Sequence, residues 1–209
     1  MKKLGILLSG RGSNFESIAR AVQEGTIAAE ISLVLSNRCE ARGIVRAKEM
    51  GFKALCIPSQ GRQREEYDRE VVKVLKDHKV DLVCMAGFLR ILSPYFIQAF
   101  PNRILNIHPS LLPAFPGLDV QRQALEWGVK FSGCTVHIAD ETLDGGPILR
   151  QAVVPVLDDD TEGTLSLRIL REEHRIYPEA IRLMVEDRIR TEGRRVIEVK
   201  KEGEGPKKV

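Results

Sequence analysis

The 209-residue sequence lacks the features that would place it in a membrane, in a secretory route or on nucleic acid. It has no apolar run approaching the roughly 20 residues that span a bilayer. The apolar run at residues 4–8 is too short for a signal peptide and ends in Ser-Gly-Arg-Gly. The formal net charge is only +3, and the body of the chain has no dense basic run. Membrane insertion and nucleic-acid binding are therefore not indicated.

Cysteine is also scarce. The four cysteines are Cys39, Cys56, Cys84 and Cys134, and no two have the C-x-x-C spacing of a metal-ligand pair. Cys56 and Cys84 lie in apolar runs, where a thiol usually acts as a small hydrophobic group. We therefore expect all four thiols to be reduced, no metal to be bound, and the protein to be cytoplasmic.

What the sequence does contain is typical of a globular enzyme-sized domain. Hydrophobic residues make up 43% of the chain and charged residues 29%. The length suits one domain with one good core. We expect this domain to span residues 1–191, with a nucleotide-binding half at 1–108 and a smaller part at 109–191. Residues 192–209 are rich in Lys, Glu, Gly and Pro and predict a loose charged tail.

Strand-like and helix-like segments alternate along the first half. Continuous apolar runs predict strands at residues 4–9, 31–35, 53–57, 81–85 and 103–108. Helical spacing predicts intervening helices at residues 15–23, 41–50 and 62–78, and a short one from Ser93. This alternation predicts an α/β fold with an open, mostly parallel, doubly wound sheet that is Rossmann-like in its N-terminal half.

The pattern changes after residue 108. A helix is predicted at residues 120–127, and the alternating segments 132–139 and 149–156 flank the turn at 140–147. These segments predict an antiparallel strand pair added to the edge of the sheet. A long helical stretch follows at residues 161–187, kinked or restarted near Pro178.

Asn106 and His108 lie at the end of the strand predicted at residues 103–108. Two residues apart on an extended chain, they point to the same face, and Pro109 should end the strand. Ligands bind at the carboxyl ends of strands in open α/β sheets. An amide donor beside a titratable imidazole suits a reacting carbonyl. By itself, however, a polar pair at a strand end is more often a capping or turn device.

A glycine-containing loop, Ser9-Gly-Arg-Gly-Ser-Asn14, joins the first predicted strand to the first helix. It is neither a Walker loop nor a full dinucleotide fingerprint, because Phe15 stands where the third glycine would be. The N–H groups of Gly12, Ser13 and Asn14 would lie at the helix N-terminus, where the helix dipole favours an anion. We therefore prefer a phosphate site over a plain tight turn.

The turn Leu143-Asp-Gly-Gly-Pro147 is the third candidate. Its glycines allow the backbone to approach a ligand closely. Asp144 could orient His108 and favour its protonated form. Asp-Gly is equally common in hairpin turns, and the spacing alone does not decide between the two.

Together these motifs resemble the phosphoribosylglycinamide formyltransferase family, the folate-dependent formyl transfer enzymes of purine synthesis. The resemblance extends from about residue 4 to residue 178. The matching segments are Ser9–Asn14, Ala86-Gly-Phe-Leu-Arg-Ile-Leu-Ser93, Asn106-Ile-His-Pro-Ser-Leu-Leu-Pro113, Pro116-Gly117, Leu143–Pro147 and Glu173-His-Arg-Ile-Tyr-Pro178. The His-Pro-Ser-Leu-Leu-Pro motif is shared by the wider formyltetrahydrofolate-using superfamily, whereas the glycine loop and Glu173-His174 are more specific.

The resemblance implies a role for each matching position. The formyl group of 10-formyltetrahydrofolate would pass to the amine of glycinamide ribonucleotide without a metal. The catalytic positions match Asn106, His108 and Asp144. The nucleotide-binding positions match Gly12, Ser13, Asn14 and Glu173. The folate-binding positions match Arg64, Leu89, Arg90, Ile91, Leu92 and Asn106, with the backbone of residues 139–143 completing the pterin pocket.

Two positions depart from some relatives. Leu89 stands where some carry Met, and both side chains are apolar. Asp119 stands where some carry His, so the role of this position is left open. We interpret His137 as structural, on a strand near the site.

Three other functions share some of these sequence features. A formyltetrahydrofolate hydrolase would be expected to carry an additional N-terminal domain, whereas this chain begins at its first strand. A tRNA formyltransferase would need a C-terminal nucleic-acid-binding domain. A non-catalytic nucleotide-binding module would not need Asn106, His108 and Asp144 together. We expect only small-molecule partners, and either a monomer or a homodimer.

Overall fold

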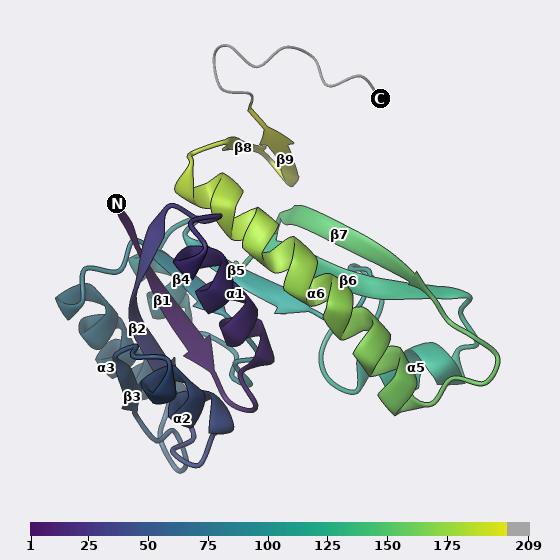
Figure 1. The fold of residues 1–209 in the computed structure, drawn as a ribbon, viewed down its shortest axis with the longest axis horizontal. Coiled ribbons are helices and arrows are strands. Elements are labelled where there is room, and N and C mark those ends of the chain that lie inside the picture. The colour runs from purple at the N-terminus through teal and green to yellow at the C-terminus, as the bar shows by residue number, and fades with distance from the viewer. Residues whose placement is uncertain (200–209) are drawn as a thin grey trace.

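Within residues 1–199, which the computed structural model describes, nine strands form one sheet in the order β3-β2-β1-β4-β5-β6-β7-β9-β8 (Figure 1). The strands are β1 (Lys2–Leu8), β2 (Ala29–Ser36), β3 (Ala54–Cys56), β4 (Leu82–Met85), β5 (Ile104–His108), β6 (Phe131–Ile138), β7 (Ile148–Pro155), β8 (Ile189–Glu192) and β9 (Arg195–Glu198). The helices are α1 (Ser13–Gln23), α2 (Arg42–Glu49), α3 (Arg64–Asp77), α4 (Pro94–Ala99), α5 (Val120–Glu126) and α6 (Glu162–Val185).

The N-terminal half is the predicted doubly wound arrangement. Strands β1 to β5 pair in parallel, with β1 between β2 and β4. Apolar side chains alternate between the two faces, as the twofold period of a strand requires. Leu4, Ile6 and Leu8 belong to the core beneath α1, α2 and α6, whereas Leu7 packs in the core beneath α3 and α4. Covered on both faces, these strands read as continuous apolar runs.

The C-terminal half adds the predicted antiparallel pair. Strand β6 pairs antiparallel with β5 and with β7. Helix α6 lies beside α1 and across β6 and β7 (Figure 1). The buried Tyr177 hydroxyl lies 3.0 Å from the carbonyl oxygens of both Met85 and Leu105, so it ties α6 to β4 and β5. This helix therefore connects the two halves of the molecule.

The predicted restart near Pro178 is wrong, because α6 runs without interruption through this residue. Its N-terminus is closed by a capping box between Thr161 and Thr164. Buried residues extend along its length from Leu165 to Val185. Packing on one face thus outweighs the hydrogen bond that proline removes.

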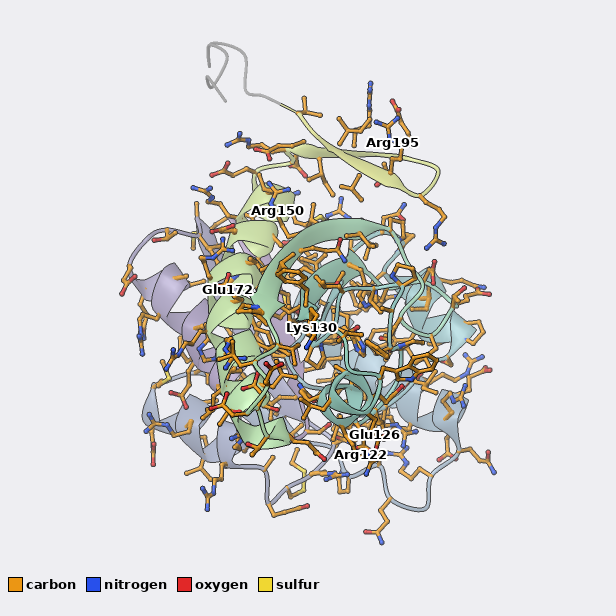
Figure 2. The ribbon with its side chains drawn as sticks, turned by 90° about the vertical axis from the view of Figure 1, so that its right-hand side faces the viewer. Arg122, Glu126, Lys130, Arg150, Glu172 and Arg195 are labelled. Atoms are coloured by element: carbon orange, nitrogen blue, oxygen red, sulfur yellow. A yellow bond between two sulfur atoms is a disulfide. The ribbon has the colours of Figure 1, made fainter. Side chains whose placement is uncertain are left out.

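The expectation of a loose tail from residue 192 also fails for its first part. Residues 195–198 form β9, which pairs with β8 and makes one parallel bridge to β7. Glu198 forms ion pairs with Arg150 of β7 and with Arg188, and Figure 2 labels Arg150 near this hairpin. Val196 and Ile197 are partly buried. Two β-branched residues are thus enough to form a strand in a segment whose overall composition predicted a loose tail. Residues 200–209 lie outside the described residues.

The expectation of four free thiols is wrong for one pair. Cys39 and Cys56 form a disulfide, with their Cα atoms 5.3 Å apart. Cys56 pairs with Ser36 at the end of β2, so the parallel register of β2 and β3 brings Cys39 near it. Cys84 and Cys134 are free and buried, and burial raises the pKa of the Cys134 thiol to about 12. None of the helices described over residues 1–199 is long and apolar enough to cross a membrane.

Candidate functional site

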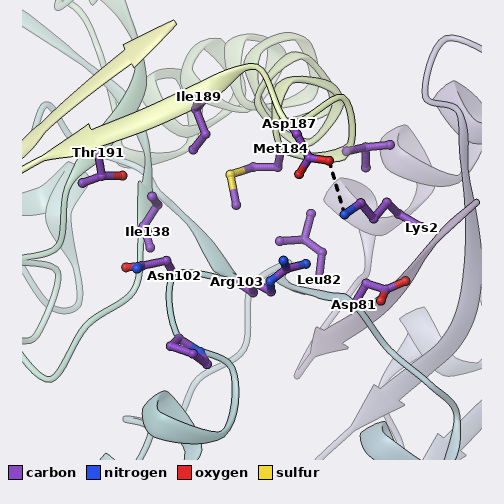
Figure 3. A pocket seen from close by; sticks show the side chains of 12 residues that line it. Lys2, Asp81, Leu82, Asn102, Arg103, Ile138, Met184, Asp187, Ile189 and Thr191 are labelled. Carbon is purple, nitrogen blue, oxygen red and sulfur yellow. Dashed lines mark ion pairs between the residues drawn. The ribbon is translucent and has the colours of Figure 1, made fainter. Parts of the chain in front are cut away.

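Two cavities lie at opposite ends of β4 and β5. One, of about 330 Å³, lies at their amino ends beside β8, and the ion pair between Lys2 and Asp187 stands at its edge (Figure 3). The other, of about 580 Å³, lies at their carboxyl ends. No site residue predicted from the sequence lines the first cavity. Those that line the second are Asn14, Leu89, Arg90, Ile91, Leu92, Asn106, His108, Asp144 and Glu173.

Asp144 is the centre of the polar cluster in the larger cavity. Its Oδ2 accepts a hydrogen bond from the Gly117 backbone N–H at 2.8 Å and lies 3.5 Å from Nδ1 of His108. Its Oδ1 lies 3.5 Å from Nδ2 of Asn106. The Asp144 backbone has φ of +48°, in the left-handed region that Asp tolerates better than most residues. The turn thus places one carboxylate between two side chains of β5.

His108 is almost fully buried, and both of its ring nitrogens face oxygen atoms. Nε2 lies 2.9 Å from the carbonyl oxygen of Phe115, to which it can only donate. Nδ1 faces the Asp144 carboxylate at 3.5 Å. A neutral ring that donates from Nε2 would turn a lone pair toward this carboxylate. The geometry therefore suits a doubly protonated imidazole.

The loop that supplies the Phe115 carbonyl is itself held by hydrogen bonds. Ser110 donates to the Ala114 carbonyl at 2.6 Å. Thr135 of β6 donates to the Ser110 carbonyl at 2.7 Å and accepts from the Leu112 N–H at 3.0 Å. The Ser-Leu-Leu-Pro part of the sequence motif therefore fixes the acceptor that orients His108.

His137, which we interpreted as structural, contacts the cluster directly. Its Nε2 lies 3.1 Å from Nδ2 of Asn106 and 3.8 Å from Oδ1 of Asp144. Because an amide nitrogen only donates, Nε2 must accept, and the ring must be neutral. Burial lowers the pKa of His137, although the Asp144 carboxylate opposes this shift. His137 is thus suited to orient the Asn106 amide.

The glycine loop lies at the N-terminus of α1, as predicted. Gly12 is the N-cap, with φ of +84°, and the first-turn N–H groups have no partner within the helix. A Cβ at Gly12 would lie 2.6 Å from Cα of Gly43, the second residue of α2. The Gly43 N–H donates to the Gly10 carbonyl at 3.0 Å. Close backbone packing against α2 thus fixes the loop, and Gly43 was not identified from the sequence.

Asn14 and Glu173 connect this loop to the cavity. Nδ2 of Asn14 donates to Oε2 of Glu173 at 2.7 Å, and both side chains are buried. Burial raises the pKa of Glu173, while the hydrogen bond from Asn14 opposes the shift. Oδ1 of Asn14 is buried without a hydrogen-bond partner in the described chain. Gly12 and Ser13 immediately precede Asn14 but do not line the cavity.

The loop after β4 forms an apolar wall. Leu89 and Ile91 are 55% and 50% exposed, as expected of side chains that face a large open cavity. The Arg90 guanidinium lies over the Tyr67 ring, 4.5 Å from its centre. Arg64 begins α3 and is exposed, but it does not line the cavity. Its folate contact stays a prediction.

Among the residues that the structure describes, no group of three or more His, Cys, Asp and Glu side chains is arranged to hold a metal ion. The polar side chains of the cluster around Asp144 are instead amide, imidazole and carboxylate groups. Such a set can donate to a developing oxyanion and move a proton.

Comparison with known proteins identifies the family. The formyl transferase family model matches residues 2–181. The Escherichia coli phosphoribosylglycinamide formyltransferase is 42% identical over 186 residues, which cover 88% of each chain. The crystal structure of glycinamide ribonucleotide transformylase 1 from Symbiobacterium toebii is 50% identical, with a TM-score of 0.94 over 96% of this chain and 95% of that one.

A longer relative contains the same region. The trifunctional purine biosynthetic protein adenosine-3 of Drosophila melanogaster is 46% identical over 187 residues. These residues are 88% of this chain but only 14% of the fly protein. The region held in common is therefore one part of that longer protein.

Proposed function

Because this chain belongs to the formyl transferase family, we propose that it transfers the formyl group of 10-formyltetrahydrofolate to the amine of glycinamide ribonucleotide in purine biosynthesis. The products are formylglycinamide ribonucleotide and tetrahydrofolate. Relatives named phosphoribosylglycinamide formyltransferase, whose alignments with this chain cover most of both sequences, support this reaction.

The observation that carries the proposal is the composition of the larger cavity. Asn106, His108 and Asp144 share it with Asn14 and Glu173, which reach it from α1 and α6. A cluster able to activate a carbonyl therefore lies beside a helix N-terminus suited to a phosphate. Such a cavity can hold two reactants in one orientation, and positioning alone supplies much of the rate of a bimolecular reaction.

We assign each reactant to one side of this cavity. The first-turn N–H groups of α1 at Gly12, Ser13 and Asn14 would hold the nucleotide phosphate, and Glu173 would accept from the ribose hydroxyls. The apolar wall formed by Leu89–Leu92 would cover the pterin ring, together with the backbone of residues 139–143. In this arrangement the amine and the formyl carbon would meet near β5.

The reaction balances without an added reagent. The amine nitrogen bonds to the formyl carbon, and the carbonyl oxygen becomes an oxyanion. The bond from this carbon to the folate nitrogen then breaks, and the proton lost by the amine ends on that nitrogen.

Asn106 can stabilise the oxyanion through one of its two amide hydrogens. One hydrogen is engaged by His137 Nε2 at 3.1 Å, and the other points toward Asp144 Oδ1 over a long 3.5 Å contact. The second hydrogen is therefore available to a substrate oxygen without loss of a strong hydrogen bond. His137 would keep the amide in this orientation.

His108 and Asp144 act as a charged pair in this scheme. A protonated His108 beside Asp144 stabilises negative charge on the substrate oxygen. The proton on Nδ1, which faces Asp144 over a long 3.5 Å contact, is the one it could pass on. Phe115 and Gly117 hold the pair through backbone groups. Loss of one donor to an oxyanion typically costs about 2.7–4 kcal/mol, or roughly a hundredfold or more in rate.

The direct test is to mix the protein with both substrates and follow tetrahydrofolate formation. We expect sustained turnover with the unaltered chain and severe loss in His108→Ala and Asn106→Ala variants that still bind both substrates. Absence of turnover by the unaltered, folded protein would contradict the proposal.

A further inference from the structure

The wall loop, residues 87–92, contains neither helix nor strand, yet it lines much of the larger cavity. Its side chains at Leu89 and Ile91 are half-exposed, so packing of these side chains alone cannot set the shape of the loop. The buried Phe88 and the Arg90 guanidinium over Tyr67 anchor its middle, and backbone hydrogen bonds hold its two ends. Ser93, at its far end, donates its N–H to the buried Asp68 carboxylate at 2.6 Å.

Ser9 holds the near end of the wall loop by two hydrogen bonds. The Ser9 N–H donates to the Gly87 carbonyl at 3.0 Å. The Ser9 hydroxyl oxygen accepts from the Leu89 N–H at 2.8 Å. Ser9 is only 3% exposed, so water does not replace these contacts readily.

The hydroxyl of Ser9 is oriented in turn by Asn37, which follows β2. It donates to Oδ1 of Asn37 at 2.6 Å, and Nδ2 of Asn37 donates to the Ser59 hydroxyl at 3.0 Å. The Ser59 N–H also donates to the Asn37 carbonyl at 3.3 Å. Asn37 and Ser59 are 6% and 9% exposed. The result is a buried chain of hydrogen bonds that ends on the Leu89 backbone.

None of Ser9, Asn37 and Ser59 lines the cavity. We propose that Asn37 is a positioning residue, which fixes the wall loop through the Ser9 hydroxyl without touching a ligand. A hydroxyl carries one proton, and Asn37 takes it. A lone pair of the Ser9 oxygen is thereby left facing the Leu89 N–H.

The inference rests on the proposed function in one respect only, which is that the ligand of the wall loop is 10-formyltetrahydrofolate. Without the Asn37 side chain, the Ser9 hydroxyl loses its acceptor and can rotate to donate to another oxygen atom. The Leu89 backbone then loses a fixed partner. The effect should fall on the folate side of the cavity, because the Ser9 hydroxyl bonds the wall loop, whereas the proposed phosphate donors are the N–H groups of residues 12–14 at the start of α1.

The test compares Asn37→Ala with Asn37→Asp, which keeps an oxygen acceptor for Ser9. Ser32→Ala is a matched control. The Ser32 hydroxyl donates to the His78 carbonyl from within β2, the strand that Asn37 follows, but far from the wall loop. For each variant, KM for each substrate, kcat and melting temperature are measured. Isothermal titration with 10-formyltetrahydrofolate gives the folate affinity separately.

For Asn37→Ala we expect KM for 10-formyltetrahydrofolate to rise roughly tenfold, from the loss of one buried hydrogen-bond partner. KM for glycinamide ribonucleotide should change less than about twofold. Asn37→Asp should recover most of the folate affinity, and Ser32→Ala should leave both KM values unchanged. Ser9→Ala breaks the same link from its other end and provides the comparison if Asn37→Ala does not fold.

Folate KM values within about twofold of normal in folded Asn37→Ala and Ser9→Ala would overturn the inference, even if both variants melt at lower temperature. Equal losses for both substrates would overturn it too. If the unaltered protein neither binds nor turns over 10-formyltetrahydrofolate, the proposed function fails instead, so the two failures are distinguishable.

Discussion

Asp144 Oδ2 lies 3.5 Å from Nδ1 of His108, while the opposite ring nitrogen donates to the Phe115 carbonyl. The carboxylate thus lies beside the ring nitrogen that would carry a second proton, where its negative charge can stabilise the imidazolium. Asp144 belongs to a turn and has a left-handed backbone conformation.

Replacement of Asp144 by Asn should keep the fold and lower kcat by roughly a hundredfold or more, on the scale of losing an oxyanion donor. A neutral amide cannot favour the imidazolium as a carboxylate does. It can still accept from the Gly117 N–H, so the turn should persist. Steady-state kinetics between pH 6 and 9 would check this, and near-normal kcat in a folded variant would show that the charge is not needed.

His137 should act as a neutral acceptor for Asn106. His137→Phe leaves the Asn106 amide without this partner and should lower kcat by about tenfold. His137→Gln offers an amide oxygen and should retain more activity. Because burial lowers the pKa of His137 below its ordinary 6.5, its protonation should reduce kcat only at more acidic pH. This acid limb should be absent in His137→Gln, and identical profiles for the two proteins would refute the assignment.

A substitution in the glycine loop should weaken the binding of glycinamide ribonucleotide alone. In Gly12→Val, the added Cβ would meet Cα of Gly43 at 2.6 Å. The loop must then shift away from α2 and misalign its N–H groups. Affinity for glycinamide ribonucleotide should fall at least tenfold, on the scale of losing a charged hydrogen bond, while folate affinity stays close to normal.

Gly10→Ala is the control for this prediction, because a Cβ there meets no atom within 4 Å. Its KM values should match those of the unaltered protein. If Gly12→Val weakens both ligands equally, the loop has a structural role and not a phosphate-binding one.

The ionised form of Glu173 should reduce the stability of the folded protein. Burial raises its pKa above the ordinary 4.5, so the folded state holds the proton more tightly than the unfolded state. Stability is therefore greatest below the ordinary pKa and is lost as pH rises through the raised one. Glu173→Gln keeps an acceptor for Asn14 without the charge. It should melt higher at pH 8, by about 2–4 °C per kcal/mol relieved, and match the unaltered protein at pH 4.

The same variant should bind glycinamide ribonucleotide less well, because an amide replaces the carboxylate proposed to meet the ribose. Thermal melts at both pH values and the nucleotide KM check the two parts. A lower melting temperature at pH 8 would show that the ionised Glu173 stabilises the fold.

The parts of the site that could be predicted from sequence are those set by local geometry. Asn106 and His108 share a face because they are two residues apart on a strand, and Gly12 precedes a helix with a clear apolar period. The contact of His137 with Asn106 was not predicted, because it depends on the antiparallel register of β5 and β6, which pairs the two across 31 residues of sequence. Sequence spacing carries no such register.

Other contributions have no side-chain signal at all. The Phe115 carbonyl and the Gly117 N–H act through the backbone, and any residue could supply them. The disulfide between Cys39 and Cys56 depends on the pairing of β2 with β3. Strand β9 was missed because its charged neighbours mask the short apolar pair Val196-Ile197. Each of these features is decided by tertiary contacts, which a single sequence does not display.

The central claim is that formyl transfer needs an amine anchored by a phosphate. With 10-formyltetrahydrofolate alone, loss of the formyl group should be very slow, because water, unlike the amine of the nucleotide, has no phosphate anchor to hold it in line. Adding glycinamide ribonucleotide should raise tetrahydrofolate formation by orders of magnitude. The analogue without phosphate should raise it far less, since remote binding energy holds the amine in line. Rapid release of formate without any amine would contradict the claim and identify the protein as a hydrolase.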